Sequence, residues 1–401
     1  MKQWIKMLLQ NLVLPLIYNL YRTRAVERGL VIFADAHHTE MPFSMRRMAE
    51  AVEALLAQAP EDREICKMEN FVTDFDTLSF GAMTKYLLQF MRRYAVAEYV
   101  FICDYFLPVS SCRKRPETKV IQLWHSCGLT KKIAYDTGED IPKGYHGSMF
   151  DNYTYLTMSA EVCVPVHERA LRLPREHIFA TGISRTDYYF DESWNARCKT
   201  QFRKEHPEAE GKKIVLWAPT FRGNAAMPRL VGLDAIRQIA EELKDEWYFV
   251  IKAHPHIDRH GQVSNSLIPT EELFPVTDVL ITDYSSVLFD YLLYRRPVIL
   301  FAPDLCDYEQ ARGFYIDYRS IPFPLAQTQE ELREALRDGD FCKNRPDWYA
   351  KHTDEIDAFR RTYVGACDGH ATERILKLVG LMKTTPAVEA GEIYEKTGYL
   401  A

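Results

Sequence analysis

The sequence lacks the motifs that mark several large classes of enzyme. It contains no Walker phosphate loop, no glycine-rich dinucleotide fingerprint and no G-x-S-x-G nucleophile motif. ATPases, dehydrogenases and hydrolases of the types that carry these motifs are therefore disfavoured. Internal repeats and low-complexity segments are also missing, so nothing in the sequence indicates a repeat architecture.

Cysteine pairs and excess basic charge are missing as well. The nine cysteines include no C-x-x-C pair, which is typical of reduced thiols in a cytoplasm rather than of disulfides or a zinc site. A net charge of -6 argues against nucleic acid as a partner, because nonspecific binding needs a basic face. The 47% hydrophobic and 26% charged composition is that of a soluble globular protein, and 401 residues suffice for two α/β domains.

The apolar segment at residues 1–28 is interrupted too often for a clean membrane-spanning helix, for example at Lys6, Pro15 and Asn19. No small-residue cleavage site follows it, so a signal peptide is not indicated. Its basic residues, against the single acid Glu27, predict an amphipathic segment that lies on an anionic membrane surface. A helix packed against the protein's own core is the alternative, and both remain open.

The rest of the chain alternates strand-like and helix-like segments. Residues 29–191 predict a first doubly wound domain, and residues 214–371 predict a second. Residues 192–213 between them are polar and predict a linker. Residues 372–401 form the tail, whose helical part is expected to pack back across the N-terminal domain. The simplest architecture is two α/β sheets that face each other across a cleft.

Residues 277–290, TDVLITDYSSVLFD, combine a buried strand with the start of a helix at 287–294. Asp283, Ser285 and Ser286 lie at the turn, where side-chain oxygens cap backbone N–H groups. Such a helix start at the carboxyl edge of a sheet attracts phosphate, so we predict an anion site here. An ordinary strand-to-helix turn is the alternative.

A second cluster follows the strand at residues 120–124. His125 stands at the predicted sheet edge, where it can take a proton from a hydroxyl near neutral pH. Lys131 and Lys132 follow and can meet an anionic substrate. A structural histidine beside a solvated basic turn is the alternative.

Two more strands end in polar groups. After the strand at 214–218, Thr220 and Arg222 share one loop, and the Arg222 guanidinium can make a bidentate contact to phosphate. After the strand at 247–251, His254 and His256 follow in the same way. A polar surface loop is the alternative for the first cluster. Metal binding is the weaker interpretation of the second, because only Asp258 is near.

The common placement of these clusters is more informative than any one of them. Three surround one sheet edge of the second domain and are rich in anion-binding groups, while His125 in the first domain faces them. This is the layout of a nucleotide-diphosphate donor site opposite an acceptor site. No DxD-like clamp is present, so no metal and no bound cofactor are predicted.

The motifs resemble, in order, those of the CDP-glycerol glycerophosphotransferases, which build teichoic acids and related cell-wall or capsule polymers. The resemblance covers roughly residues 120–324, about half of the chain. It rests on Trp124-His125 with Lys131-Lys132, Ala218-Pro219-Thr220 with Arg222, His254-Pro255, Asp278 to Ser286 with Phe289-Asp290, Arg296-Pro297 and Gly313-Phe314. The family usually has glycine directly after the first histidine, where this chain has Ser126, and we expect this to alter the loop.

The resemblance implies a GT-B type α/β fold, with two Rossmann-like doubly wound domains facing a cleft. It implies a peripheral location on the cytoplasmic face of the cell membrane. The donor would be CDP-glycerol or CDP-ribitol, and the acceptor a lipid-linked glycan or a poly(alditol phosphate). His125 would be the general base and His254 would contact the donor phosphates, while Ser285 and Ser286 would hold the pyrophosphate.

The hypothesis from the sequence is transfer of an alditol phosphate to an acceptor hydroxyl, with release of CMP. Thr220, Arg222 and Asp283 belong to the expected donor side, and Lys131 and Lys132 to the acceptor side. A GT-B glycosyltransferase using a nucleotide sugar and a non-enzymatic membrane-surface binding protein are the alternatives. Glycerol or ribitol, single addition or polymerisation, and monomer or homo-oligomer are left open.

Overall fold

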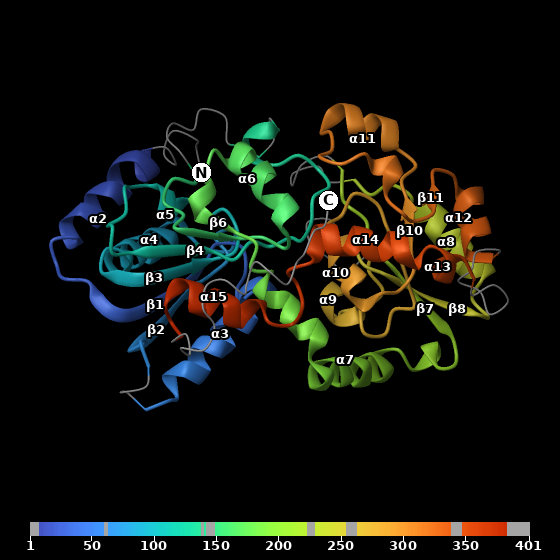
Figure 1. Ribbon diagram of the computed structural model, residues 1–401, viewed down its shortest axis with the longest axis horizontal. Coiled ribbons are helices and arrows are strands. Elements are labelled where there is room, and N and C mark those ends of the chain that lie inside the picture. The colour runs from blue at the N-terminus through green and yellow to red at the C-terminus, as the bar shows by residue number, and fades with distance from the viewer. Residues whose placement is uncertain are drawn as a thin grey trace, which may run out of the picture.

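Two parallel β-sheets form the centres of two α/β units that lie side by side (Figure 1). The structure is a computed structural model. It describes residues 8–59, 63–137, 140–141, 149–222, 229–253, 263–337 and 347–382.

The N-terminal sheet has six strands in the order β2-β1-β3-β4-β5-β6, and all of its pairs are parallel. The strands are β1 (Glu27–Asp35), β2 (Lys67–Val72), β3 (Ala97–Ile102), β4 (Lys119–Gln122), β5 (Tyr155–Thr157) and β6 (Ile178–Phe179). β1, β3 and β4 are almost continuously apolar and buried, because helices cover both faces of the sheet.

Helices cover the two faces of the N-terminal sheet with separate apolar clusters. On one face, α3 (Phe43–Leu56) and α15 (Ala371–Val379) pack against Val31 and Phe33. On the other face, α4 (Phe80–Tyr94) packs through Phe90 and its neighbours. The shorter helices α5 (Leu107–Ser110) and α6 (Val164–Leu171) complete this domain.

The C-terminal sheet has five parallel strands in the order β11-β10-β9-β7-β8. The strands are β7 (Lys213–Trp217), β8 (Trp247–Ile251), β9 (Val279–Thr282), β10 (Val298–Phe301) and β11 (Leu325–Ala326). The helices are α8 (Leu233–Glu242), α9 (Thr270–Leu273), α10 (Val287–Tyr291), α11 (Leu305–Ala311), α12 (Gln329–Arg337), α13 (Asp347–Lys351) and α14 (Thr353–Val364). The predicted architecture of two doubly wound sheets is therefore confirmed.

The segment expected to link the domains, residues 192–213, consists largely of the helix α7 (Glu192–Glu205). The helix begins at Asp191, whose Oδ1 accepts from the N–H groups of Ser193 (2.9 Å) and Trp194 (3.1 Å). Trp194 is buried, so this polar helix holds one side against the protein core.

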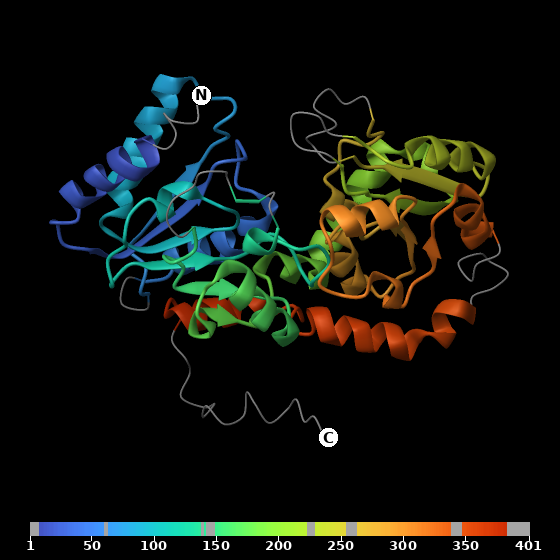
Figure 2. The same cartoon turned by 90° about the horizontal axis from the view of Figure 1, so that it is seen from above.

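The chain returns to the N-terminal domain at its end. α14 runs along the C-terminal domain and α15 lies against the N-terminal sheet (Figures 1 and 2). Asp187 fixes the start of α15, because its carboxylate accepts from the N–H groups of Ala371 (3.0 Å) and Thr372 (2.8 Å). The helix was expected from about residue 372, and it packs across the N-terminal domain as predicted.

The N-terminal segment packs one face against the protein's own core, and its opposite face is exposed. A π-helical turn (Leu9–Val13) leads into α2 (Leu14–Tyr21), which packs on α4 and buries Leu14 and Tyr18. The opposite face carries four exposed leucines at a spacing of four residues, the leucine row: Leu8, Leu12, Leu16 and Leu20. In the part of the chain that the structure describes, no helix is long and apolar enough to cross a membrane.

Candidate active site

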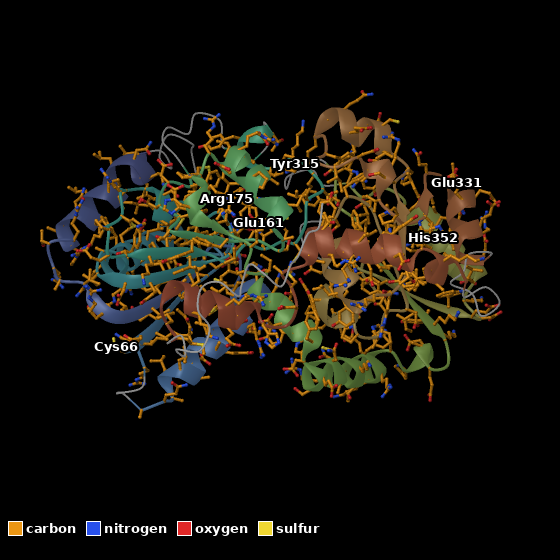
Figure 3. The ribbon with its side chains drawn as sticks, viewed as in Figure 1. Cys66, Glu161, Arg175, Tyr315, Glu331 and His352 are labelled. Carbon is orange, nitrogen blue, oxygen red and sulfur yellow. The ribbon has the colours of Figure 1, made fainter. Side chains whose placement is uncertain are left out.

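The carboxyl ends of the strands in the two sheets meet where the domains touch. Residues 130–132 of the N-terminal domain lie antiparallel to residues 313–315: Tyr315 N donates to the carbonyl oxygen of Thr130 (2.8 Å). Tyr315 is labelled in Figure 3 between the two units. Gly128 has φ +64°, and a Cβ there would lie 2.3 Å from the Phe289 ring, so glycine allows the two domains to approach closely.

The backbone before His125 is held in an unusual conformation. Trp124 has φ +58°, which a bulky residue rarely adopts, and its N–H donates to Oε1 of Gln122 (3.0 Å). Gln122 is itself buried, and its Nε2 donates to the carbonyl oxygen of Asp104 (3.0 Å). The Trp124 and His125 rings stack with centroids 5.1 Å apart. Backbone strain of this kind is typical of functional sites.

The His125 ring is arranged to accept a proton. Its Nδ1 lies 3.3 Å from the carbonyl oxygen of Cys103, and a carbonyl oxygen can only accept. Nδ1 therefore carries the hydrogen, and Nε2 keeps its lone pair. The side chain is 44% exposed, and Asp104 Oδ1 lies 3.7 Å from Nδ1, where it would stabilise the imidazolium. This geometry fits the general base that the sequence predicted.

The sequence analysis did not identify a histidine paired with an aspartate at the same sheet edge. Asp35 ends β1, and its Oδ2 lies 2.9 Å from Nδ1 of His38. The sequence does contain the pattern that marks the other clusters, because an aspartate and two histidines stand at the end of an apolar strand. These residues lie outside the stretch that carries the family resemblance, so only the strand-end rule pointed to them.

A cavity of about 480 Å³ lies between Lys131 and the C-terminal domain. It is lined by Lys131, Thr220, Phe221, Arg222, Arg229, Leu230, Val231, Asp304, Asp307, Tyr308, Ala311 and Arg312. The cavity therefore brings Lys131, expected on the acceptor side, together with the donor-side residues Thr220 and Arg222. The sequence had not indicated this grouping.

Lys131 has no ion-pair partner within 4.0 Å among the described residues. Burial lowers the pKa of its ammonium group to about 8, and the positive charge of Arg312 contributes. Thr220 Oγ1, which lies on the same cavity, is buried without a hydrogen-bond partner in the described part of the chain. An unpaired cation and an unsatisfied hydroxyl in one cavity are the polar groups that a bound anion would satisfy.

Arg222 is occupied inside the protein. Its Nε lies 2.6 Å from Asp304 Oδ2, and its Nη2 lies 2.9 Å from Asp283 Oδ2. The guanidinium carbon also lies 4.7 Å from the ring centroid of Tyr284. The bidentate contact to phosphate expected from the sequence would need guanidinium N–H groups that already pair with these two carboxylates.

The Asp283–Ser286 turn follows β9 as expected. Asp283 Oδ1 accepts from the N–H of Thr220 (2.7 Å), so the turns after β7 and β9 are joined. Ser285 Oγ accepts weakly from the N–H of Val287 (3.4 Å), whereas Ser286 makes no side-chain cap. The predicted helix at 287–294 is α10 continued by a 3₁₀ turn (Leu292–Tyr294).

The remaining predicted site residues divide into two groups. Lys132 lies at the domain contact, where its N–H donates to the carbonyl oxygen of Gly313 (3.2 Å). His254 and His256 lie outside the described residues. Lys252, which follows β8, donates from Nζ to the carbonyl oxygen of Ser266 (2.9 Å).

The two parallel sheets and their facing strand ends define a GT-B-like protein of two Rossmann-like domains. The profile of the CDP-Glycerol:Poly(glycerophosphate) glycerophosphotransferase family matches residues 16–381. The chain belongs to this family.

Curated relatives of the chain act in teichoic acid synthesis. The teichoic acid poly(ribitol-phosphate) polymerase of Bacillus spizizenii is 29% identical over 377 residues, which are 90% of this chain and 57% of the relative. The ribitol-phosphate primase of that organism is 29% identical over 73% of this chain and 77% of its own. The glycerol-phosphate primase of Bacillus subtilis is 29% identical over 61% and 68%. The chain thus spans less than two thirds of the first of these relatives.

Solved structures share the fold. The wall teichoic acid polymerase TagF superposes with a TM-score of 0.69 at 21% identity, over 94% of this chain and 97% of TagF. The UDP-GlcNAc 2-epimerase from Neisseria meningitidis superposes with a TM-score of 0.50 at 14% identity, over 87% and 98%. These likenesses confirm the predicted fold of two Rossmann-like domains.

Proposed function

We propose that the protein transfers an alditol phosphate from a CDP-linked donor to an acceptor hydroxyl in teichoic acid synthesis, with release of CMP. The observation that carries the proposal is the family match over residues 16–381, which includes both sheet edges. The orientation of His125 supports it, because Nε2 is the ring nitrogen left to take a proton. The N-terminal domain binds the acceptor and the C-terminal domain binds the donor.

The chemistry begins at His125. Its Nε2 removes the proton of the acceptor hydroxyl as that oxygen attacks the phosphorus that bears the alditol. The bond from this phosphorus to the bridging oxygen breaks, and CMP leaves with the electron pair. Charge stabilisation and positioning dominate such a phosphoryl transfer.

The donor pyrophosphate is stabilised by groups at the C-terminal sheet edge and by Lys131. Lys131 has no ion-pair partner among the residues that the structure describes and lies on the cavity that Thr220 also lines, so we assign it to the donor phosphates and not to the acceptor. Ser285 and Ser286 follow β9 at the same edge and contribute hydroxyl and backbone donors. His254 is assigned to these phosphates on the family resemblance alone.

The leucine row supports a location at the membrane surface. Its members are 49–65% exposed, while the other face of the helix is packed on the core. Arg22 and Arg24 are exposed at the end of this helix, as expected for contact with anionic headgroups. A peripheral position on the cytoplasmic face of the cell membrane would bring the protein to a lipid-linked acceptor.

The test is CMP release by the purified protein, with a lipid-linked glycan or a poly(alditol phosphate) as acceptor. CDP-glycerol and CDP-ribitol are compared, because relatives named for glycerol phosphate and for ribitol phosphate share 29% identity with the chain. We expect acceptor-dependent CMP from one of the two donors and its loss in His125→Asn. Turnover of UDP-GlcNAc without CMP from either alditol donor would instead indicate a glycosyltransferase.

A further inference from the structure

A histidine–carboxylate pair at the carboxyl edge of the N-terminal sheet has no role in the reaction as proposed so far. We infer that His38, held by Asp35, binds the hydroxyl-bearing end of the acceptor together with Asp104. The inference rests on the proposed function, because it assigns an acceptor contact within that reaction. It commits to a neutral polyol as the group that is recognised.

Asp35 is a fixed, charged partner for the His38 ring. Its side chain is 1% exposed, and its Oδ2 accepts from the N–H groups of His37 (2.8 Å) and His38 (2.9 Å). Burial alone would raise the pKa of Asp35, but the hydrogen bonds from His38 and His37 outweigh it and lower this pKa. Asp35 therefore stays ionised and can hold a protonated ring.

His38 has one ring nitrogen occupied and one available. Nδ1 lies 2.9 Å from Asp35 Oδ2 and carries a hydrogen, since a carboxylate only accepts. The side chain is 52% exposed, and Nε2 has no partner among the residues that the structure describes. The hydrogen bond to Asp35 raises the pKa of His38 more than burial lowers it, which favours the imidazolium form with an Nε2–H donor.

The charges around His38 are mainly negative. Asp35 ends β1, Asp74 follows β2 and Asp104 follows β3, and all three carboxylates raise the pKa of His38. The other titratable groups at this edge are His37, whose backbone pairs with Asp74, the Cys103 thiol, which donates to Asp35 Oδ1 (3.9 Å), and His125 beside Asp104. This excess of carboxylates opposes a phosphate group. A neutral ligand suits the edge better.

A polyol fits this arrangement because each hydroxyl both donates and accepts a hydrogen bond. One oxygen of Asp104 accepts from the N–H of Tyr105 (2.7 Å), and Oδ2 has no partner in the described part of the chain. A hydroxyl can therefore accept from His38 Nε2–H while a neighbouring hydroxyl donates to Asp104. Since Asp104 also lies 3.7 Å from the His125 ring, a polyol held there has a hydroxyl close to the base.

The test compares His38→Asn with His37→Asn in the full-length protein. Asparagine keeps an N–H near the position of Nδ1, so the Asp35 contact survives while Nε2 and its charge are removed. His37 is an exposed histidine on the same loop, and its side chain has no hydrogen bond in the described structure, which makes it a matched control. The acceptors are two synthetic alkyl-linked glycerol phosphate dimers, one with free terminal hydroxyls and one with a terminal phosphate monoester.

For the hydroxyl-terminated acceptor, we expect His38→Asn to lower kcat/KM by about tenfold or more, mostly through KM. His38→Asn should leave the KM for the donor unchanged. His37→Asn should have the same kcat/KM for this acceptor as the wild type. In the wild type, kcat/KM for this acceptor should fall as the pH rises through the pKa of His38, and the variant should lose this limb. A purely structural role would leave the pH profile in place and would alter the KM values of both substrates.

The possible outcomes separate the two levels of the proposal. An active wild type with His38→Asn unchanged, or with an equal loss in His37→Asn, would overturn this inference and leave the proposed function intact. A preference of the wild type for the phosphate-terminated dimer would overturn the polyol assignment. A wild type that releases no CMP with either donor and any of the acceptors would contradict the proposed function and this inference together.

Discussion

The carboxyl edges of the two sheets carry different kinds of charge. The N-terminal edge holds imidazoles beside carboxylates, with His125 on a backbone carbonyl oxygen and His38 on Asp35. The C-terminal edge holds Arg222, which is paired with Asp283 and Asp304, and borders Lys131, which has no ion-pair partner in the described part of the chain. One edge therefore consists of imidazoles beside carboxylates, and the other of cations that differ in their ion-pair partners.

This difference divides the reaction between the domains. A base must change its protonation state during turnover, so a half-exposed imidazole suits it. A phosphate site needs a lasting positive charge, and an ammonium group without a carboxylate partner supplies it to the ligand. Arg222, by contrast, holds the two turns together. The first four of the five predictions that follow test this division.

The largest effect is expected at the edge of the N-terminal sheet. His125→Asn should lower acceptor-dependent CMP release by about a hundred- to ten-thousand-fold, because it removes the general base. The free energy of unfolding should stay close to that of the wild type, since the side chain is 44% exposed. Activity within about tenfold of the wild type would rule out His125 as the base.

Arg222→Met should cost about 3–5 kcal/mol of unfolding free energy, measured by urea denaturation. The substitution leaves the carboxylates of Asp283, 3% exposed, and Asp304, 19% exposed, without their cation. Adding Asp304→Asn to the variant should recover part of the loss, because one uncompensated charge is removed. A loss below about 1 kcal/mol would show that Arg222 does not hold these turns.

Lys131→Met should behave in the opposite way from Arg222→Met. Donor affinity, measured by calorimetry with CDP-glycerol and CDP-ribitol, should fall by about ten- to a hundredfold, because a charge-assisted contact is lost. The unfolding free energy should rise, because a partly buried charge that has no ion-pair partner among the described residues is replaced by an apolar side chain. Lower stability with unchanged donor affinity would make Lys131 structural.

The same lysine predicts a pH dependence. Its pKa of about 8 lies below the ordinary value of 10.5, so the unfolded chain binds the proton more tightly. The charged lysine therefore destabilises the fold below pH 8, and this penalty disappears as the pH rises from 8 to 10.5. Donor affinity should fall as the pH rises through 8. Lys131→Met should show neither this fall in affinity nor the rise in stability.

The smallest effect is expected far from both edges. Leu12→Ser with Leu16→Ser should weaken binding to anionic lipid vesicles by about tenfold, as measured by co-sedimentation. Both leucines are at least 59% exposed, so urea unfolding should change little. Zwitterionic vesicles serve as the control for the basic residues. Equal vesicle binding by the variant and the wild type would remove the leucine row from any membrane contact.

The fold could be predicted largely because strand burial is a local property of the sequence. β4, β7, β8 and β9 lie where the apolar runs of the sequence predicted strands. The strand β2 was not predicted, because it lies at the edge of the sheet with a neighbouring strand on one side only. Its sequence, KMENFV, accordingly mixes polar and apolar residues. The leucine row and the buried Tyr18 belong to one helix, so the sequence alone could not separate packing from exposure.

The pairing of charges in the site could not be predicted, because the partners are distant in sequence. The sequence predicted that Arg222 binds phosphate, but the fold places Asp283, after β9, and Asp304, after β10, against its guanidinium group. The sequence placed Lys131 on the acceptor side, but residues 130–132 pair with the C-terminal domain, so Lys131 lies beside the donor-side residues. His125, in contrast, stands directly after its strand, so its place at the edge followed from local pattern.

The central claim is tested most directly by the fate of the phosphorus that bears the alditol. The donor is CDP-glycerol or CDP-ribitol labelled with ³²P at that phosphorus, and the wild-type protein is supplied with acceptor. The account predicts label in the acceptor and unlabelled CMP, in equal amounts, with both products lost in His125→Asn. Label that stays with the nucleotide as CDP would mean that the alditol is transferred without its phosphate, and would contradict the account.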